Sequence, residues 1–192
     1  MEAILGFDFA ILDFIRENIA NPLMDVIMKI VTASGDAGLI WIAAIILCLV
    51  FKKTRRAGVC MAIAMILVLL ICNLTLKPII ARPRPFSLKE GIELIIAAPK
   101  DFSFPSGHTA SSFAAATGLF IYHKKLGIAA LIWAFLIAFS RLYMYVHYPT
   151  DVMAGMLVGI LCAVIGMVLV NKFYQPISDR ITEKFKKKRE NN

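Results

Sequence analysis

The sequence predicts an all-α protein, an integral-membrane helical bundle of about five transmembrane helices with short interfacial helices at its N-terminus. Three observations indicate this class. First, 59% of the 192 residues are hydrophobic and the mean hydropathy is +0.75, whereas a soluble domain is about 45–50% apolar. Second, the apolar residues gather in runs long enough to cross a bilayer, which takes roughly 20 helical residues. Third, residues 1–32 are amphipathic rather than uniformly apolar.

The amphipathic N-terminal stretch has acidic residues among its apolar positions. Asn21-Pro22 interrupts it, because this dipeptide favours a turn. We therefore expect two short helices that lie at the membrane interface. Acids also stand where a cleavable signal peptide has its basic region, so no such signal is expected.

Five apolar runs follow this stretch. The predicted spans are Ser34–Phe51, Ala57–Leu76, Ser106–Tyr122, Leu126–Tyr143 and Asp151–Val170. They divide the chain into an interfacial segment (1–33), a transmembrane bundle (34–172) and a basic cytoplasmic tail (173–192). Small residues recur at helix-contact spacing in the third and fifth runs, which favours close helix packing in lipid. These residues are Ala110, Ala114, Gly118, Gly155 and Gly159.

The net charge of +8 is distributed as a topology signal. Most basic residues lie in short loops and in the tail, a pattern that argues against a nucleic-acid partner. Since Lys and Arg concentrate in cytoplasmic loops, the clusters at 52–56, 124–125 and 172–189 predict a cytoplasmic C-terminus. The N-terminal segment, the loop 81–105 and the loop around His147 then lie outside. We expect a multi-pass protein of the cell membrane.

Neither the cysteines nor the remaining acids form a metal-binding pattern. The four cysteines are Cys48, Cys60, Cys72 and Cys162. All sit inside apolar runs without a CxxC pair, which predicts small buried hydrophobic side chains. The acids Glu90, Glu93 and Asp101 lack metal-ligand spacing. We therefore expect no metal and no other cofactor.

Three polar clusters fall at the predicted external ends of the spans. They are Lys77, Arg82 and Arg84; Pro105-Ser106-Gly107-His108; and Ser140-Arg141 with His147 and Asp151. Ionisable groups at a bilayer margin are costly unless they have partners or a ligand. The cations in these clusters outnumber the acids, so a bound dianion would balance the charge.

Each cluster suits phosphate, although each also has a structural interpretation. Arginine gives bidentate donors, and lysine gives a point charge. The N-terminus of a helix that opens at Ser106 would attract an anion, and Gly107 lets the backbone approach it. Alone, the basic residues could be interfacial anchors, Ser106 a helix cap, and His147 with Asp151 a structural pair. Three clusters on one predicted face favour a phosphate site.

The two histidines can divide the chemistry. His147 lies four residues before Asp151, whose carboxylate can accept a hydrogen bond from one ring nitrogen. The tautomer is then fixed, and the other nitrogen is free to attack phosphorus. His108 is available as the acid that protonates the leaving oxygen. Lysine and arginine would stabilise the transition-state charge, so the reaction needs no metal.

In these residues the sequence resembles the type 2 phosphatidic acid phosphatase superfamily. The family pattern is Lys, six residues, Arg-Pro; Pro-Ser-Gly-His; and Ser-Arg, five residues, His, three residues, Asp, and it is complete here between Lys77 and Asp151. The resemblance implies His147 as nucleophile, Asp151 as its partner and His108 as general acid. It implies phosphate binding by Lys77, Arg84, Ser106, Gly107 and Arg141. Arg82 lies outside the pattern, and we add it only as a candidate contact to a second phosphate group.

The leading interpretation is a metal-independent membrane phosphatase that hydrolyses a lipid phosphate or diphosphate through a phosphohistidine intermediate. We favour undecaprenyl diphosphate, because the predicted external site and the compact form resemble bacterial members that act on it. Phosphatidylglycerol phosphate and phosphatidic acid carry similar anionic heads. Membrane lipids are the expected surroundings, and the sequence predicts no oligomeric state.

Three alternatives remain beside this interpretation. The first is transfer of the phosphoryl group from His147 to an alcohol. The second, of another class, is a lipid carrier that binds the headgroup without chemistry. The third is a vanadium haloperoxidase, whose motifs are similar, but those enzymes are soluble and the predicted spans argue against it. The apolar stretch Ile92–Ile96 is expected to border the substrate entrance.

Overall fold

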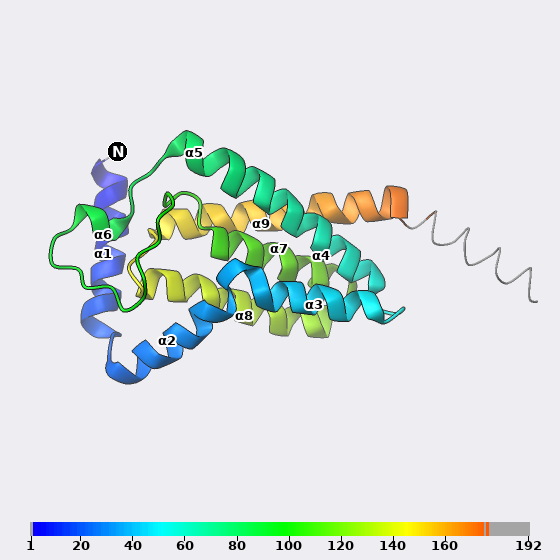
Figure 1. The fold of residues 1–192 in the computed structure, drawn as a ribbon, viewed down its shortest axis with the longest axis horizontal. Helices are drawn as coiled ribbons and strands as arrows, with labels where there is room; N and C mark the ends of the chain where they lie inside the picture. The colour runs from blue at the N-terminus through cyan, green and yellow to red at the C-terminus, as the bar shows by residue number, and fades with distance from the viewer. Residues whose placement is uncertain (1, 175, 177–192) are drawn as a thin grey trace, which may run out of the picture.

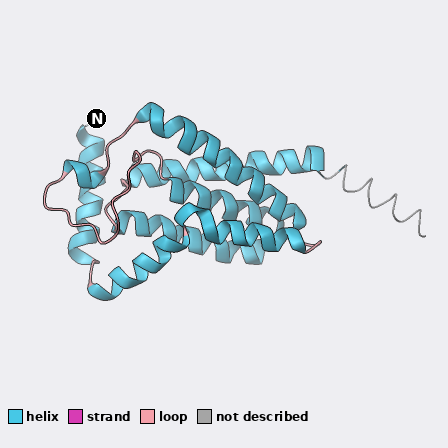
Figure 2. Cartoon of the chain, viewed as in Figure 1, coloured by secondary structure: helices cyan, strands magenta, loops and turns pink. Residues whose placement is uncertain are grey.

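The structure, a computed structural model, describes residues 2–174 and 176, which form helices and loops without a strand (Figures 1 and 2). The predicted all-α class is thereby confirmed. Most of the predicted basic tail (173–192) lies outside the described residues. The helices are α1 (Glu2–Asn18), α2 (Pro22–Ser34), η1 (Asp36–Gly38), α3 (Leu39–Val50), α4 (Arg55–Val68), η2 (Leu69–Leu76), α5 (Lys77–Ile80), α6 (Pro85–Leu88), α7 (Gly107–Tyr122), α8 (Lys124–Tyr143), α9 (Pro149–Leu169) and η3 (Val170–Tyr174).

The N-terminal stretch forms two helices, as predicted, with the break at Asn21-Pro22. The Asn21 side chain caps α2 by accepting a hydrogen bond from the Met24 backbone N–H at 3.0 Å, which satisfies one of the unpaired donors at a helix start. Pro22 fits the first helical position because it has no N–H to leave unpaired. Figure 1 shows α1 lying across one end of the bundle, at a steep angle to the other helices. Placement of α1 and α2 at a membrane interface stays a prediction.

The first predicted span begins later than expected. Ser34 still belongs to α2, and α3 starts only at Leu39. Between them, Ala37 and Gly38 have φ angles of 50° and 69°, a left-handed conformation that interrupts a right-handed helix. The axes of α2 and of the segment Asp36–Val50 differ by 47°. Hydropathy missed this bend because it reports the polarity of a segment and not its backbone angles.

Three helical segments of the described chain are long and apolar enough to cross a membrane, namely Arg55–Leu88, Lys124–Tyr143 and Pro149–Tyr174, although residues 81–84 of the first are not helical. The bent pair of α2 and α3 forms a fourth candidate. The predicted third span corresponds to α7, which has 16 residues and packs against α4, α8 and α9. With α7 included, the fold agrees with a prediction of about five membrane helices.

Small residues bring α7 and α9 into backbone contact. A Cβ atom at Gly155 would lie 2.6 Å from the Ser106 carbonyl oxygen, and one at Gly159 would lie 2.4 Å from that of Ala110. These distances leave no room for a larger side chain, as expected for close packing in lipid. The Ser106 N–H also donates to the Asp151 carbonyl oxygen at 3.1 Å. The starts of α7 and α9, which carry residues of two of the three polar clusters, are therefore held side by side.

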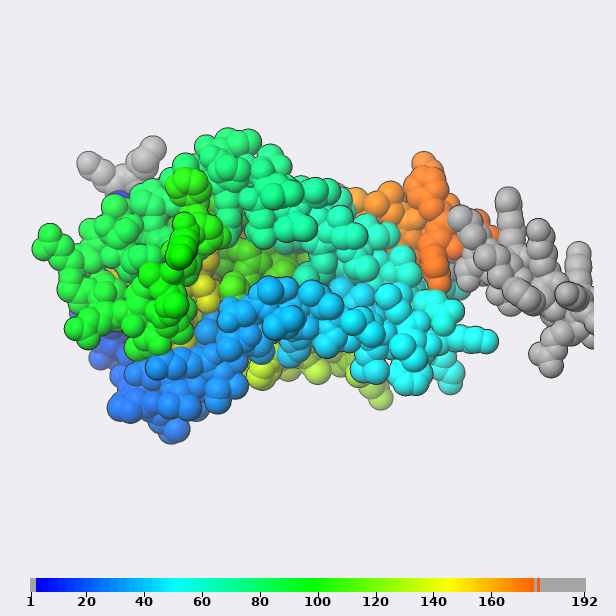
Figure 3. Space-filling view, viewed as in Figure 1, coloured from blue at the N-terminus to red at the C-terminus, as the bar shows by residue number. Residues whose placement is uncertain are grey.

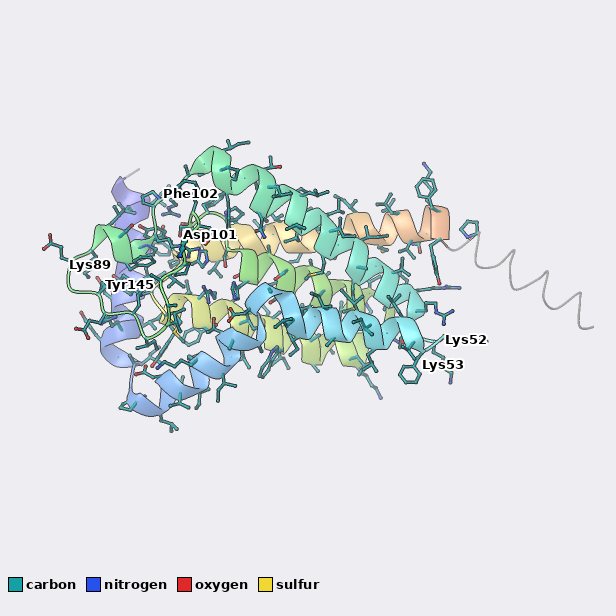
Figure 4. The ribbon with its side chains drawn as sticks, viewed as in Figure 1. Lys52, Lys53, Lys89, Asp101, Phe102 and Tyr145 are labelled. Atoms are coloured by element: carbon teal, nitrogen blue, oxygen red, sulfur yellow. The ribbon has the colours of Figure 1, made fainter. Side chains whose placement is uncertain are left out.

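The two ends of the bundle differ in what they carry. The long loop between α6 and α7 lies at the same end as α1, and Figure 4 shows Lys89, Asp101 and Tyr145 there. Figure 3 shows this loop and α2 covering that end in the space-filling view. Lys52 and Lys53 lie at the opposite end (Figure 4). This separation agrees with the predicted grouping of polar motifs and basic loops at opposite ends of the spans.

Candidate active site

The three polar clusters meet at one cavity of about 310 Å³ at the α1 end of the bundle. The predicted site residues that line it are Lys77, Arg84, His108, Arg141 and His147. Asp151 is completely buried beside His147, while Ser106 and Gly107 form the start of α7 next to His108. The fold thus brings together residues of the three clusters that are far apart in the chain.

The cavity has a surplus of positive charge. Its lining contains the cations Lys29, Lys77, Arg84 and Arg141 and the carboxylates Asp36 and Asp101. Four cations against two carboxylates leave two positive charges, with the histidines left out of the count. A phosphate monoester carries about −1.5 to −2 charges at pH 7, so its charge complements that of the cavity.

Asp101 connects two of the cations. Lys77 Nζ donates to Asp101 Oδ2, and Arg84 Nη2 donates to Asp101 Oδ1 at 2.6 Å. Burial alone would raise the pKa of Asp101, but hydrogen bonding and charge from Lys77, together with Arg84, lower it to about 2. The carboxylate is therefore ionised at neutral pH and pairs with both cations in the wall of the cavity. Sequence reasoning missed this role because it considered Asp101 only as a metal ligand.

His147 lies in the turn between α8 and α9 and is 1% exposed. Its Nε2 atom is 3.3 Å from Arg84 Nη1, and its Nδ1 atom is 3.5 Å from Asp151 Oδ2. Burial lowers the pKa of His147 to about 3; the Asp151 carboxylate opposes this effect, and the charges of Arg84 and Arg141 add to it. The imidazole is therefore neutral near pH 7, with a lone pair on one ring nitrogen.

Asp151 accepts hydrogen bonds from several donors, whereas His147 Nδ1 has no hydrogen-bond partner among the described residues. Its Oδ2 atom accepts from the Ser103 hydroxyl and, at 3.0 Å, from the Tyr148 N–H, and Arg82 donates to Oδ1 at 2.6 Å. The bond from the Tyr148 N–H ties the carboxylate to the N-cap residue of α9. The carboxylate next to His147 is therefore fixed in position before a ligand binds.

Arg82, the candidate contact to a second phosphate group, is paired with two carboxylates. It is absent from the lining of the cavity, and its guanidinium donates to Asp8 Oδ2 at 2.7 Å as well as to Asp151. It also stacks on the Tyr148 ring, 3.8 Å from the centroid. Asp8 on α1 is buried, although an acid of the N-terminal segment was expected at the membrane interface. Its carboxylate pairs with the Arg82 guanidinium, which we had expected to contact a second phosphate. In this arrangement Arg82 ties α1 to the start of α9.

The start of α7 combines a cap with open space. The Ser106 hydroxyl accepts from the Thr109 N–H at 3.4 Å and from the Thr109 hydroxyl at 2.9 Å, so it acts as the N-cap. At Gly107, an added Cβ would lie 3.1 Å from Asn73 Oδ1 and 3.7 Å from Lys77 Nζ. The glycine therefore leaves room next to Lys77. Phosphate binding by Ser106 and Gly107 stays a prediction.

The remaining two residues of the motifs contact the N-terminal helices. Arg141 is 3% exposed, and its Nη1 atom donates to Thr32 Oγ1 at 2.5 Å. His108 Nε2 lies 2.8 Å from Asp36 Oδ1. Sequence analysis assigned no site role to Thr32 or Asp36, because they precede the first motif by more than one helix. The acidic character of the N-terminal segment was the available signal.

A second, more apolar cavity of about 550 Å³ adjoins the first. Lys77, Asp101 and His108 line both cavities, whereas side chains of α3, α4 and η2 line only the second. These include Ile42, Met65, Ile66, Val68 and Leu69. Ile96, from the apolar loop stretch, lines the first cavity. A polar pocket thus continues into an apolar groove between helices.

The described residues hold no group of three or more His, Cys, Asp or Glu side chains that could bind a metal ion. The cations of the cavity instead come from lysine and arginine. These side chains can stabilise charge on phosphoryl oxygens without a metal. Independence from metals stays a prediction, to be tested with a chelator.

The helical membrane fold and the complete set of three motifs define a membrane phosphatase. The chain belongs to the PAP2 superfamily, whose family model matches residues 56–175. It is 36% identical over 121 residues to the undecaprenyl-diphosphatase of Sulfolobus acidocaldarius, which covers 62% of this chain and 58% of that protein. It is 30% identical over 155 residues to the lipid A 4'-phosphatase of Bacteroides thetaiotaomicron, covering 73% of this chain and 67% of that one. The chain thus spans less than two thirds of the Sulfolobus protein.

Two solved structures have a similar fold. Aquifex aeolicus LpxE matches with a TM-score of 0.72 and 30% identity, covering 84% of this chain and 94% of that one. The transmembrane PAP2 type phosphatidylglycerolphosphate phosphatase of Bacillus subtilis matches with a TM-score of 0.71 and 27% identity, covering 90% of this chain and 89% of that one. These similarities support a membrane protein with the predicted helical architecture.

Proposed function

We propose that this protein hydrolyses a lipid phosphate or diphosphate through a phosphohistidine intermediate at His147. The main observation is a neutral, buried imidazole that lines a cavity with two surplus positive charges. A carrier would need the charge but not a nucleophile beside a fixed carboxylate. The names of the relatives, which are phosphatases of lipid substrates, support the same reaction class.

In the first step, His147 Nε2 attacks phosphorus while the bond from phosphorus to the leaving oxygen breaks. Lys77, Arg84 and Arg141 stabilise the charge on the phosphoryl oxygens. His108 gives a proton to the leaving oxygen. The Nδ1–H of the phosphorylated His147 then faces Asp151, which lies 3.5 Å away in the ligand-free structure, and such contacts often shorten when substrate binds.

In the second step, water attacks the phosphohistidine. His108, now neutral, takes a proton from that water, the bond between phosphorus and His147 Nε2 breaks, and inorganic phosphate leaves. His147 and His108 return to their starting protonation states, so the cycle consumes one water molecule. An alcohol in place of water would give phosphotransfer by the same chemistry.

Two features favour a lipid diphosphate as the substrate. The apolar groove next to the phosphate cavity suits a hydrocarbon tail. Lys29 of α2 also lines the cavity and is a candidate contact for a second phosphate in place of Arg82. Undecaprenyl diphosphate combines these two parts, and the name of the Sulfolobus relative supports this choice.

The substrate prediction is a higher kcat/KM for undecaprenyl diphosphate than for phosphatidylglycerol phosphate or phosphatidic acid, measured by phosphate release in one detergent with EDTA present. Lys29→Ala should reduce kcat/KM for the diphosphate by about 10–150-fold, because one charged contact is worth about 1.5–3 kcal/mol, with less effect on the monophosphates. Lys89→Ala is the control, since Lys89 pairs with Asp13 and does not line the cavity.

Each outcome of this assay decides a different part of the proposal. A preference for either glycerophospholipid rejects the substrate and keeps the mechanism. Loss of activity in EDTA rejects independence from metals. Binding of all these lipids without phosphate release by purified wild-type protein would favour the carrier.

The proposed sidedness predicts which positions are accessible from outside the cell. In a variant without the four native cysteines, which are all buried, Glu90→Cys should react with a membrane-impermeant thiol reagent in intact cells. Lys53→Cys should react only after permeabilisation, because it lies at the basic end of the bundle (Figure 4). The reverse labelling pattern would place the active site on the cytoplasmic face.

A further inference from the structure

The bend between α2 and α3 brings the carboxylate of Asp36 into contact with the His108 ring. Asp36 belongs to η1, and its Oδ1 atom lies 2.8 Å from His108 Nε2. Both side chains line the phosphate cavity. Asp36 is not part of any of the three motifs, so its contact with His108 is a feature of this fold that the family pattern does not describe.

The bend is packed tightly against the histidine ring. A Cβ atom at Gly35 would lie 3.0 Å from His108 Cδ2 and 3.1 Å from Ile137 Cγ2, distances at which a neighbour has to move. Hydrogen bonds from the Gly35 N–H to Thr32 O and from the Gly38 N–H to Gly35 O, both at 3.0 Å, hold the turn. Glycine at 35 therefore lets the backbone support the ring directly and sets the position of Asp36.

Asp36 offsets the positive charges that surround His108. The cations Lys77 and Arg141 act on the ring from α5 and α8, and Asp36 acts on it from η1. An acid catalyst has to carry a proton in this positive surrounding, and a carboxylate in direct contact favours that state. Asp101 is already engaged by Lys77 and Arg84, which leaves Asp36 as the cavity carboxylate that contacts His108.

We propose that Asp36 is a positioning residue, which orients His108 through Nε2 and keeps its proton available for the leaving oxygen at Nδ1. This inference rests on the proposed function, in which His108 is the general acid. Asp36 touches neither the phosphorus nor the nucleophile in the proposed mechanism. Its effect should therefore depend on how much the leaving group needs a proton.

The test compares two leaving groups. Asp36→Asn should lower kcat for phosphatidic acid, which releases an alkoxide, by about 10–100-fold, within the range of general acid catalysis. With p-nitrophenyl phosphate, whose leaving group needs no proton, kcat should stay within about threefold, and KM should change little for either substrate. Asp36→Glu should restore part of the loss, and Gly35→Ala should reproduce it by displacing the ring.

A matched control and a double variant isolate the contact. Asp25 on α2 accepts a hydrogen bond from the Tyr143 hydroxyl at 2.5 Å and does not line the cavity, so Asp25→Asn should leave the ratio of the two activities unchanged. Asp36→Asn combined with His108→Gln should be no slower than His108→Gln alone, because residues that act through each other are not additive.

The outcomes separate this inference from the proposed function. Equal losses on both substrates, or additive losses in the double variant, would overturn the role of Asp36 while hydrolysis by the wild type stands. Absence of turnover by the wild type on undecaprenyl diphosphate as well as on these two substrates would overturn the proposed function and this inference with it. Because Asp36 has a 61% exposed side chain, the asparagine variant is expected to fold, and gel filtration in detergent checks this.

Discussion

His147→Ala should reduce turnover of every phosphate substrate by on the order of 10⁴-fold or more, as removal of a covalent nucleophile does in other enzymes. The reason is that no other neutral ring nitrogen lies beside Arg84 among the described residues of the cavity. The measurement is single-turnover phosphate release, together with trapping of ³²P-labelled protein at alkaline pH, where phosphohistidine is stable. The wild type should be labelled and the variant should not.

His123→Ala provides the control for the loss of a histidine. His123 lines a separate pocket with Lys52 and Lys53, at the basic end of the bundle, and should be dispensable for turnover. His147 lies in a turn between two helices, so its replacement should leave the bundle intact, which gel filtration in detergent verifies. Labelling of the alanine variant, or turnover near that of the wild type, would remove His147 from the mechanism.

The sequence predicts those site residues that have a fixed spacing along one helix or lie at its start. His147 lies just before α9, Asp151 lies in its first turn, and Ser106 caps α7, as expected from their positions. The small residues predicted to bring helices together place α7 against α9, where a Cβ at Gly159 would meet the Ala110 carbonyl oxygen. Local geometry and close packing therefore account for the meeting of two motifs.

The unpredicted part consists of partners that are distant in the chain. Asp8 pairs with Arg82, Asp36 with His108, and Asp101 with Lys77. An acid in an amphipathic segment has the same sequence signature whether it faces water or a buried cation, so no local pattern distinguishes these roles. The fold decides them, because α1 crosses the end of the bundle and the bend after α2 turns toward α7.

The same reasoning explains the wrong expectation about the first span. A run such as Leu39–Val50 is apolar enough to predict a membrane helix, but the residues before it contain a left-handed turn. Hydropathy alone extended the helix through Gly35 and Gly38. Ala37 is a non-glycine residue with positive φ. The sequence pattern does not reveal this strained backbone conformation, which the packing of the folded chain maintains.

Asp151→Asn should lower kcat by about 10²–10⁴-fold with a smaller change in KM, as expected when a histidine loses the carboxylate that sets its tautomer. Asparagine keeps the shape of the side chain but removes the negative charge that would stabilise Nδ1–H in the phosphorylated His147. It also has one acceptor oxygen for the donors that now share two, namely Ser103, Tyr148 and Arg82.

Two further variants separate the charge of Asp151 from its surroundings. Ser103→Ala removes one donor and keeps the carboxylate, so kcat should fall by about tenfold or less, because only one hydrogen bond to the carboxylate is lost. Asp8→Asn removes the other acid on Arg82 without touching His147, and it should lower the melting temperature in detergent more than it lowers kcat. If a folded Asp151→Asn protein kept kcat within about tenfold of the wild type, the orientation of His147 would have to come from its contact with Arg84, and the carboxylate would serve to anchor α1 and α9 through Arg82.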